Sequence, residues 1–465
     1  MSSTAHLFLF EAIQDGLSAI HDRDTAFLSG PTPEILGAGA LESAFPVTDL
    51  AVASIGSAAA ALAAHAGQAA GTAPGVRVSR RLASLWFDRS LRPIGWRVPS
   101  VRDAMTGDYR GADGWIRLHA NAPHHRERAL GLLGAGGDHE EVARRVAKHE
   151  VRELEEALVA AGACAAAMRT REEWAAHPQG SAVAASPLLA ARRGREGRGA
   201  AAGQARPDRP LAGLRVLDLT RVLAGPVSTR FLAGYGAQVL RIDPPTWTEP
   251  GVVPEVTLGK FCAGLDLTTR ADRDEFTRLL AQADVLVHGY RPGALAGLGF
   301  DEDERQRIRP GLVDVSLDAY GWSGPWSGRR GFDSLVQMSC GIAEAGMRWR
   351  SADRPVPLPV QALDHASGYI MAAAVLHGLI RRCQDGAGSI VKLALAGTAH
   401  LLMSAPAQAG RAFLPVEDAD FNVVEERTAW GPARRLVPPC DVAGIPMRWE
   451  RAAGPLRAEP TRNFF

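Results

Sequence analysis

The 465-residue sequence contains very little lysine and few cysteines. Its positive charges are almost all arginine, and its only lysines are Lys148, Lys260 and Lys392. The five cysteines are scattered and never form a CxxC pair, which argues against both a disulfide framework and a zinc site. We therefore expect reduced thiols in a cytoplasmic protein.

Strong net charge is also absent, since the formal value is +1 and the charges are spread along the chain. No basic stripe favours nucleic acid, and no polybasic patch favours an anionic membrane. The N-terminus has no basic leader before a long apolar run, and no stretch reaches membrane-spanning length without interruption. The motifs G-x-G-x-x-G and G-x-x-x-x-G-K-[ST] are missing, which disfavours NAD or FAD and excludes a P-loop.

The length suits two or more domains, each with its own apolar interior. Residues 190–211, AARRGREGRGAAAGQARPDRPL, cannot bury enough apolar surface to order themselves, so we predict a linker there. The predicted division is an N-terminal segment of unknown role (1–45), a remnant repeat of a large-domain helical region (46–104), a small α+β domain (105–189), the linker (190–211), a large domain (212–410) and a Pro-rich C-terminal segment (411–465).

Downstream of the linker, short apolar runs alternate with helical stretches. LRVLDL (214–219), AQVLRID, ADVLVHGY and GLVDVSL are expected strands, and 226–235 is an expected helix. This pattern predicts a doubly wound, mostly parallel, Rossmann-like α/β sheet. Upstream, a strand-like run at 113–121, a helical run at 139–162 and a helix stopped by His-Pro predict the smaller α+β unit.

The sequence also contains a weak internal repeat. Shifting it by 315 positions, the separation of Asp49 from Asp364, brings DLAVASIGSAA onto DHASGYIMAAA. Two later matches are Gly71 with Gly386 and Val76 with Val391. Alanine-rich helices align easily, so a duplication and a chance match both stay open. Asp49 is otherwise read as a helix cap or a solvated acid.

Several loops follow the expected strands in a fixed order. TRVLAGP (220–226) lies at the carboxyl end of the first strand, where open parallel sheets bind ligands, although alone it could be an ordinary turn with Pro226 at the first helical position. RIDPP, GLDLTT, ADVLVHGYRPGALAGLGF and GWSGPWSGRRGFDSLVQ come next. Together these runs resemble the family III CoA-transferases, the group of formyl-CoA and carnitine CoA-transferases and α-methylacyl-CoA racemases. The resemblance covers roughly residues 211–400, and DGWIRLHANAPHHRERALGLLG through EEWAAHPQG is similar to that family's small domain.

The resemblance implies roles for individual residues. Asp364 in QALDHASGY matches the family's catalytic nucleophile, although an Asp at a helix start is more often only a cap. Asp333 falls where transferases often carry a supporting acid. The positions that match CoA-binding residues are Leu223, Ala224, Leu265, Asp266, Leu267, Thr268, Gly289, Tyr290, Arg291 and Arg330.

The implied chemistry is transfer of CoA between an acyl-CoA and a carboxylic acid. The carboxylate, in a partly dry pocket, attacks the thioester and passes through a mixed anhydride to an aspartyl-CoA thioester. Backbone N–H groups at the helix start would stabilise the oxyanion. No metal is expected, because the adjacent His124 and His125 diverge on a helix and lack a third ligand nearby.

Two alternatives stay open. A racemase-like isomerase acting on 2-methylacyl-CoA is disfavoured because the racemases carry a His where this chain has Phe332, which cannot move a proton. A non-catalytic CoA-binding subunit is motivated by the small domain preceding the large one and by Gly297, where the family often has arginine. The resemblance implies an interlocked homodimer, and the repeat leaves open whether one chain mimics that pairing.

Overall fold

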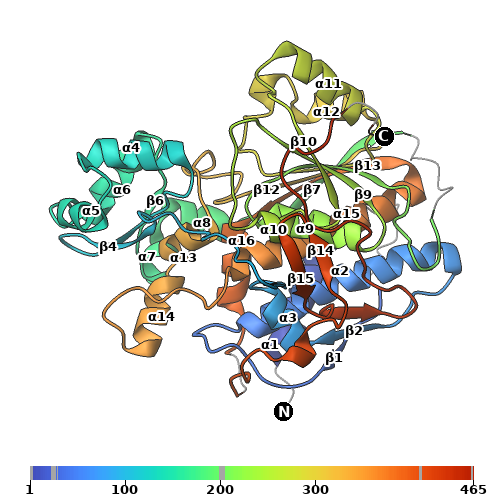
Figure 1. The fold of residues 1–465 in the computed structure, drawn as a ribbon, viewed down its shortest axis with the longest axis horizontal. Coiled ribbons are helices and arrows are strands. Elements are labelled where there is room, and N and C mark those ends of the chain that lie inside the picture. The colour runs from blue at the N-terminus through green and yellow to red at the C-terminus, as the bar shows by residue number, and fades with distance from the viewer. Residues whose placement is uncertain are drawn as a thin grey trace.

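The computed structural model describes residues 4–21, 28, 30–197, 205–407, 411–461 and 464. Its centre is a seven-stranded sheet with the order β10-β9-β8-β11-β12-β13-β7 (Figure 1). Every neighbouring pair is parallel except β13 with β7. The strands are β7 (Leu189–Glu196), β8 (Arg215–Leu219), β9 (Gln238–Asp243), β10 (Lys260–Gly264), β11 (Val285–His288), β12 (Val313–Asp318) and β13 (Ala387–Ala394). The expected doubly wound, mostly parallel sheet is confirmed.

Both faces of this sheet are buried, because successive side chains of a strand point to opposite sides. Val216 and Val287 belong to the larger core, on the face covered by α9 (Ala224–Gly234) and α15 (Ala362–Asp385). Leu217 and Leu286 belong to a second core on the opposite face, where α11 (Arg270–Leu280) and α12 (Glu302–Ile308) pack. Figure 1 shows these two helix layers above and below the sheet.

The strand order changes direction between β8 and β11. β8, β9 and β10 follow one another toward one edge, whereas β11, β12 and β13 follow one another toward the other edge. Open parallel sheets bind ligands at such a switch point, at the carboxyl ends of the strands. The loops after β8 and β11 meet there, since the Arg221 guanidinium donates a hydrogen bond to the Tyr290 hydroxyl at 3.1 Å.

A second group of elements lies to the left in Figure 1. It comprises the antiparallel sheet of β4 (Gly107–Arg110), β5 (Trp115–Leu118) and β6 (Ala165–Ala167), with α4 (Pro123–Leu133), α5 (His139–Val146) and α6 (Val151–Ala160). The single helical run expected at 139–162 is wrong, because the chain breaks between α5 and α6. The Asp113 carboxylate, from a distant loop, accepts the N–H of Val151 at 2.8 Å and so begins a new helix.

The helix expected to stop at His-Pro does so. α7 (Arg171–Ala176) ends before His177, and α8 (Pro178–Ala184) begins at the proline, which is favoured at a first helical position. The loop segments that follow β12 carry α13 (Asp333–Ser339) and α14 (Ile342–Arg350), and α16 (Leu395–Ser404) follows β13.

The predicted linker at 190–211 is wrong over its first part, which is the edge strand β7. Its backbone pairs with β13, so its stability comes from ladder hydrogen bonds and needs little apolar burial. Arg192 and Arg193 form ion pairs with carboxylates beside them, including Arg193 Nη1 with Asp385 Oδ2 at 2.5 Å. Residues 198–204 lie outside the described ranges, and the last part of the predicted linker, 205–211, is described and buries Arg209 and Leu211.

The two ends of the chain meet in two small sheets. β1 (Glu34–Leu36), β2 (Val76–Ser79) and β16 (Cys440–Val442) form one, and β14 (Glu426–Thr428), β15 (Gly431–Arg435) and β3 (Leu91–Pro93) form the other. The Pro-rich C-terminal segment therefore adds strands to both sheets, because its partners include strands from the N-terminal region. The end regions also carry the helices α1 (Thr4–Ser18), α3 (Arg80–Trp86) and η2 (Asp418–Asp420). The short helices α10 (Val253–Val256) and η1 (Ala296–Leu298) lie between strands of the large sheet.

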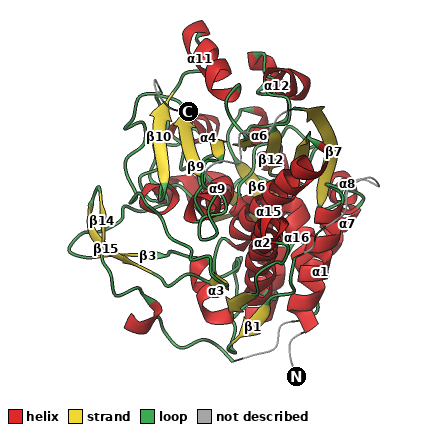
Figure 2. Ribbon diagram, turned by 90° about the vertical axis from the view of Figure 1, so that its right-hand side faces the viewer, coloured by secondary structure: helices red, strands yellow, loops and turns green. Residues whose placement is uncertain are grey.

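The longest N-terminal helix is α2 (Val47–Ala70), which lies beside α15 in the centre of the molecule (Figure 2). Its segment Val47–Gln68 is apolar and long enough to cross a membrane by length and composition, contrary to the expectation that no stretch would be. The window that passes this test is entirely buried in the protein, as is typical of a core helix.

Candidate functional site

Asp364 lies in the first turn of α15 but does not cap it. The N-cap is Gln361, and no side chain of this helix makes a capping hydrogen bond. Instead Asp333, from α13, accepts the backbone N–H groups of Leu363 and Asp364 at 2.9 and 3.0 Å on one carboxylate oxygen. These N–H groups are among those that a helix start leaves unpaired. Asp333 therefore caps α15 from another helix. The Asp364 carboxyl takes no part in this cap.

The Asp333 carboxylate is itself held in place. Its other oxygen accepts a hydrogen bond from the Gln337 amide at 2.5 Å, and the Gln337 carbonyl oxygen accepts the N–H of Leu358 at 2.8 Å. Leu358 belongs to the segment that leads into α15. Asp333 and Gln337 thus connect α13 both to the first turn of α15 and to the segment before it.

Burial puts both carboxyl groups in a poor environment for charge. Burial, opposed by its hydrogen bonds to Asp364, Gln337 and Leu363, raises the pKa of Asp333 to about 6. Burial, and then the negative charge of Asp333, raise the pKa of Asp364 well above its ordinary value. No described side chain or N–H donates a hydrogen bond to the Asp364 carboxyl oxygens, so nothing offsets these two effects.

A glycine brings the loop after β8 against this helix. Gly368 lies one turn beyond Asp364, on the same face of α15. A Cβ built at Gly368 would come within 2.4 Å of the Ala224 carbonyl oxygen, so no other residue fits here without a backbone shift. Asp364 therefore faces the start of α9, whose N-cap is Leu223.

That loop contains a strained residue. Val222 has a φ of 64°, a value that β-branched side chains rarely adopt. Its N–H donates to Glu249 Oε2 at 2.8 Å, and Glu249 Oε1 accepts from Arg241 Nη2 at 2.5 Å. The Arg241 guanidinium also donates bidentate hydrogen bonds to the Asp243 carboxylate, at 2.9 and 3.0 Å. Such strain persists only where the surroundings hold it, and it gathers at functional sites.

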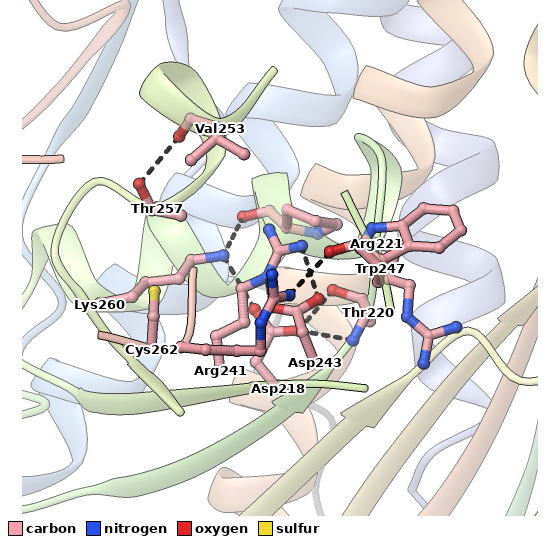
Figure 3. A network of polar contacts seen from close by, with 12 residues as sticks. Asp218, Thr220, Arg221, Arg241, Asp243, Trp247, Val253, Thr257, Lys260 and Cys262 are labelled. Carbon is pink, nitrogen blue, oxygen red and sulfur yellow. Dashed lines mark hydrogen bonds and ion pairs between the residues drawn. The ribbon is translucent and has the colours of Figure 1, made fainter. Parts of the chain in front are cut away.

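A second part of this network, drawn in Figure 3, supports the turn from β8 into α9. Asp218 accepts hydrogen bonds from the Thr220 N–H at 2.9 Å and from the Thr229 hydroxyl at 2.6 Å. Lys260 reaches from β10 to Asp218 at 2.8 Å and to the Pro226 carbonyl at 3.0 Å. Both side chains of the Lys260–Asp218 pair are fully buried.

Burial and the neighbouring charges shift the pKa values of Asp218 and Lys260 to different extents. Burial raises the pKa of Asp218, but Lys260 and Arg241 outweigh it and lower the pKa overall. Burial also lowers the pKa of Lys260, and the attraction of Asp218 offsets it only in part. The converging donors around Asp218 favour the charged pair, since a neutral lysine would leave this carboxylate without its nearest cation.

The other residues predicted to bind CoA fall in two places. Tyr290 and Arg291 line a cavity of about 370 Å³ at the carboxyl ends of β11 and β12. Leu265 and Leu267, after β10, are packed in the core beneath α11. The Asp266 carboxylate accepts from the N–H and hydroxyl of Thr268, at 3.0 and 2.6 Å, and so shapes the turn before α11.

Three arginines gather between the switch point and α4. Arg291 and Arg128 both act on Arg330, whose pKa is lowered by burial first and then by these positive neighbours. Within the described ranges none of the three forms an ion pair, although most other arginines near the sheet do. Arg128, on α4, is not among the CoA-binding positions that the resemblance implies.

Phe332, next to Asp333, is covered by two histidines that sequence reasoning did not place here. The rings of His119 and Phe332 stack with centroids 3.7 Å apart, and His125 lies at 6.2 Å. Burial and positive neighbours lower the pKa of His119 to about 3 and that of His125 to about 4. Neither ring nitrogen of His125 has a hydrogen-bond partner among the described residues.

Asp318, at the end of β12, is another carboxyl that the sequence analysis missed. Its oxygen accepts the Gly321 N–H at 2.5 Å, and burial, only partly opposed by such bonds, raises the pKa to about 7. The available signal was an acidic residue closing a predicted strand in SLDAYG, the same signal that RIDPP carries.

Comparison with known proteins identifies the family. The family model described as CoA-transferase family III matches residues 211–422. The acetyl-CoA:oxalate CoA-transferase of Acetobacter aceti is 30% identical over 52% of this chain and 69% of its own length.

The chain belongs to the family III CoA-transferases.

Two further relatives of this family III chain match over smaller parts of their lengths. The acetyl-coenzyme A transferase nodX of Hypoxylon pulicicidum is 39% identical over 39% of this chain and 31% of its own. The probable fatty acyl-CoA transferase Rv3272 of Mycobacterium tuberculosis is 35% identical over 41% of this chain and 51% of its own. This family III chain thus spans about half the length, or less, of these two relatives.

Proposed function

We propose that this protein moves CoA between an acyl-CoA thioester and a carboxylic acid, with Asp364 as the covalent nucleophile. The observation that carries the proposal is the arrangement at the start of α15. Asp333 caps the helix there, and the buried Asp364 carboxyl makes no hydrogen bond with the described residues. A carboxylate with few hydrogen bonds is a stronger nucleophile than a hydrated one. The matched relatives, named as acetyl-CoA and fatty acyl-CoA transferases, support the same class of substrate.

In the first half-reaction an Asp364 oxygen attacks the thioester carbonyl carbon. The C–S bond breaks, and the products are a mixed anhydride and CoA thiolate. The thiolate then attacks the aspartyl carbonyl of the anhydride, which releases the donor carboxylate and leaves an aspartyl-CoA thioester. The acceptor carboxylate repeats these two steps in the opposite sense and restores Asp364. No proton is transferred, and no redox partner is needed.

The oxyanion of each tetrahedral intermediate needs donors other than those expected from the sequence. The first-turn N–H groups of α15 at Leu363 and Asp364 already bind Asp333. We assign the oxyanion to the start of α9, which Gly368 brings against α15 and whose N-terminal dipole favours negative charge. CoA would lie at the switch point, with Arg291, Arg330 and Arg128 facing its phosphates.

Trapping the intermediate tests this proposal. We expect that incubation with acyl-CoA, followed by borohydride or hydroxylamine, modifies one peptide, the one that contains Asp364. Borohydride should reduce the aspartyl thioester to the alcohol, and hydroxylamine should give the hydroxamate. Tandem mass spectrometry locates either product. A modified residue elsewhere, or CoA binding without any trapped product, would contradict the assignment.

The charge of Asp333 should control the pH dependence. Asp364 must be ionised to attack, so kcat/KM should rise with pH through its elevated pKa. Asp333→Asn removes the neighbouring negative charge but keeps an oxygen that can accept the Leu363 and Asp364 N–H groups. We therefore expect the acid limb to move to lower pH by about one unit or more. Asp333→Ala, which also loses the cap, should lower kcat as well. If the acid side of the kcat/KM–pH profile does not move in Asp333→Asn, the charge effect is refuted.

A second candidate function is isomerisation of a 2-methylacyl-CoA. His125 favours it, because a neutral and unpaired imidazole beside Phe332 could supply the acid/base group that Phe332 lacks. The same incubation in deuterated water, without an acceptor acid, separates the two functions. Deuterium at the α-carbon supports the isomerase, and an acyl-CoA that stays undeuterated supports transfer alone.

A further inference from the structure

Helices α2 and α15 correspond feature by feature, although they lie in different parts of the chain. Each has 24 residues. The N-cap residues Pro46 and Gln361 have φ/ψ angles of −77°/63° and −76°/64°, and the C-cap glycines have 77°/−10° and 76°/−6°. All these pairs differ by the same 315 positions that relate Asp49 to Asp364.

The strands that follow the two helices continue the correspondence. Val78 of β2 pairs with Ile35 on a parallel neighbour and with Cys440 on an antiparallel neighbour. Leu393 of β13, again 315 positions later, pairs with Leu317 on a parallel neighbour and Leu189 on an antiparallel one. α3 and α16 then begin at equivalent residues. Alanine-rich helices align by chance, but the registers of two strand pairs do not.

The two helices lie side by side (Figure 2), and the contacts at their two ends show that they run in the same direction. The segments that lead into them, 42–45 and 356–359, line one cavity of about 300 Å³. Near their ends, the Gln68 amide donates to the Ile380 carbonyl at 3.5 Å. Equivalent segments therefore meet each other, as expected when two copies are related by an approximate two-fold axis parallel to the helices.

The two copies differ at their aspartates. Asp49 and Asp364 are both the third residue of their helices, but Asp49 Oδ1 accepts a hydrogen bond from Arg80 Nη1 at 2.8 Å and lies 3.7 Å from His6 Nδ1. Arg80 begins α3, and the residue that begins α16 is the apolar Leu395. Only residues 37–46 connect β1 to α2, so this copy has no segment equivalent to the one that carries Asp333.

We propose that β1, α2, β2, α3 and β16 are a second, silenced copy of the unit formed by β12, α15, β13, α16 and β7. In this copy Arg80 converts the former nucleophile, Asp49, into a structural ion pair. The chain then mimics within itself the pairing of two catalytic units but reacts at one aspartate only. This inference rests on the proposed function of Asp364.

The electrostatics of the two aspartates have opposite consequences for stability. Burial raises the pKa of Asp49, but the nearby His6 and the hydrogen-bonded Arg80 outweigh it and lower the pKa overall. A lowered pKa stabilises the fold above the unfolded pKa, and this stabilisation is lost as the pH falls through the folded value. The raised pKa of Asp364 stabilises the fold only at low pH, so at neutral pH its charge opposes folding.

Matched substitutions test the inference. At neutral pH we expect Asp49→Asn to lower Tm and to leave transfer per folded molecule unchanged, because Arg80 loses its buried partner. Asp364→Asn should leave Tm unchanged or raised. The double variant Asp49→Asn with Arg80→Leu, which leaves no unpaired buried charge and copies Leu395, should recover part of the lost Tm. Failure of Asp49→Asn to lower Tm would overturn the ion-pair role.

The wild-type protein gives a readout that no folding defect can obscure. Borohydride trapping with saturating acyl-CoA should label at most one aspartate per chain, with none on the peptide that contains Asp49. A label on that peptide overturns the silenced copy while leaving the proposed function standing. Absence of label on both peptides refutes the proposed function, and the Tm contrast then still decides the role of Asp49.

Discussion

Asp364→Asn is expected to lower kcat for CoA transfer by at least about 10³-fold, because an amide cannot form the anhydride or the aspartyl thioester. The remaining geometry should persist. The Asp364 N–H still binds Asp333, and the lost carboxyl makes no hydrogen bond with the described residues. Steady-state assays with an acyl-CoA donor and a carboxylic acid acceptor measure the effect.

The appropriate control for this variant is substrate binding. Asp364→Asn should retain affinity for the acyl-CoA within a few fold, since the arginines at the switch point are unchanged, and isothermal titration calorimetry measures this directly. Transfer at the wild-type rate by a homogeneous Asn variant would show that another residue carries the acyl group.

Lys260→Met is expected to have the largest effect on stability, lowering the free energy of unfolding by about 3–5 kcal/mol. The substitution leaves the fully buried Asp218 without the ammonium that lies 2.8 Å away. It also removes the bond to the Pro226 carbonyl, which helps to hold the turn from β8 into α9. Chemical denaturation measures the loss, and we expect KM for acyl-CoA to rise because the loop containing Val222 is less well held.

Lys392 provides a matched control. It forms an ion pair with Glu302 at 2.7 Å, but its side chain is 28% exposed and that of Glu302 is 29% exposed. Solvent screens such a pair, so Lys392→Met should cost about 1 kcal/mol or less. If the two lysine variants lowered the free energy of unfolding equally, burial of the Lys260–Asp218 pair would not increase its contribution to stability.

Four strands of the central sheet, β8, β9, β11 and β12, could be predicted from the sequence because their signals are local. Runs such as LRVLDL and GLVDVSL alternate with helical segments. Each run is apolar on both faces of the strand, and this pattern is visible in its own residues. The edge strand β7 could not be predicted, since Arg192 and Arg193 carry no apolar pattern and the strand exists only because β13 lies beside it.

The order of the loops was enough to single out Asp364 and Asp333, because the motifs lie in one stretch of chain. The sequence could not predict that Asp333 caps α15 and that Asp364 does not. Whether an Asp at a helix start caps that helix depends on whether another acid reaches the same N–H groups, and Asp333 comes from a separate helix 31 positions away. Lys260 stood out by its rarity, but its partner Asp218 is 42 positions distant.

By itself, then, the sequence determined the α/β class, the positions of four strands of the large sheet (β8, β9, β11 and β12), the family resemblance and the identity of the candidate nucleophile. These properties follow from patterns that neighbouring residues carry. Only the tertiary structure decided which of two similarly placed aspartates is held in a buried ion pair. Protonation and hydrogen bonding in a buried site depend on the charges brought alongside, and those charges, Asp333 for Asp364 and Arg80 for Asp49, come from segments that meet only when the chain is folded.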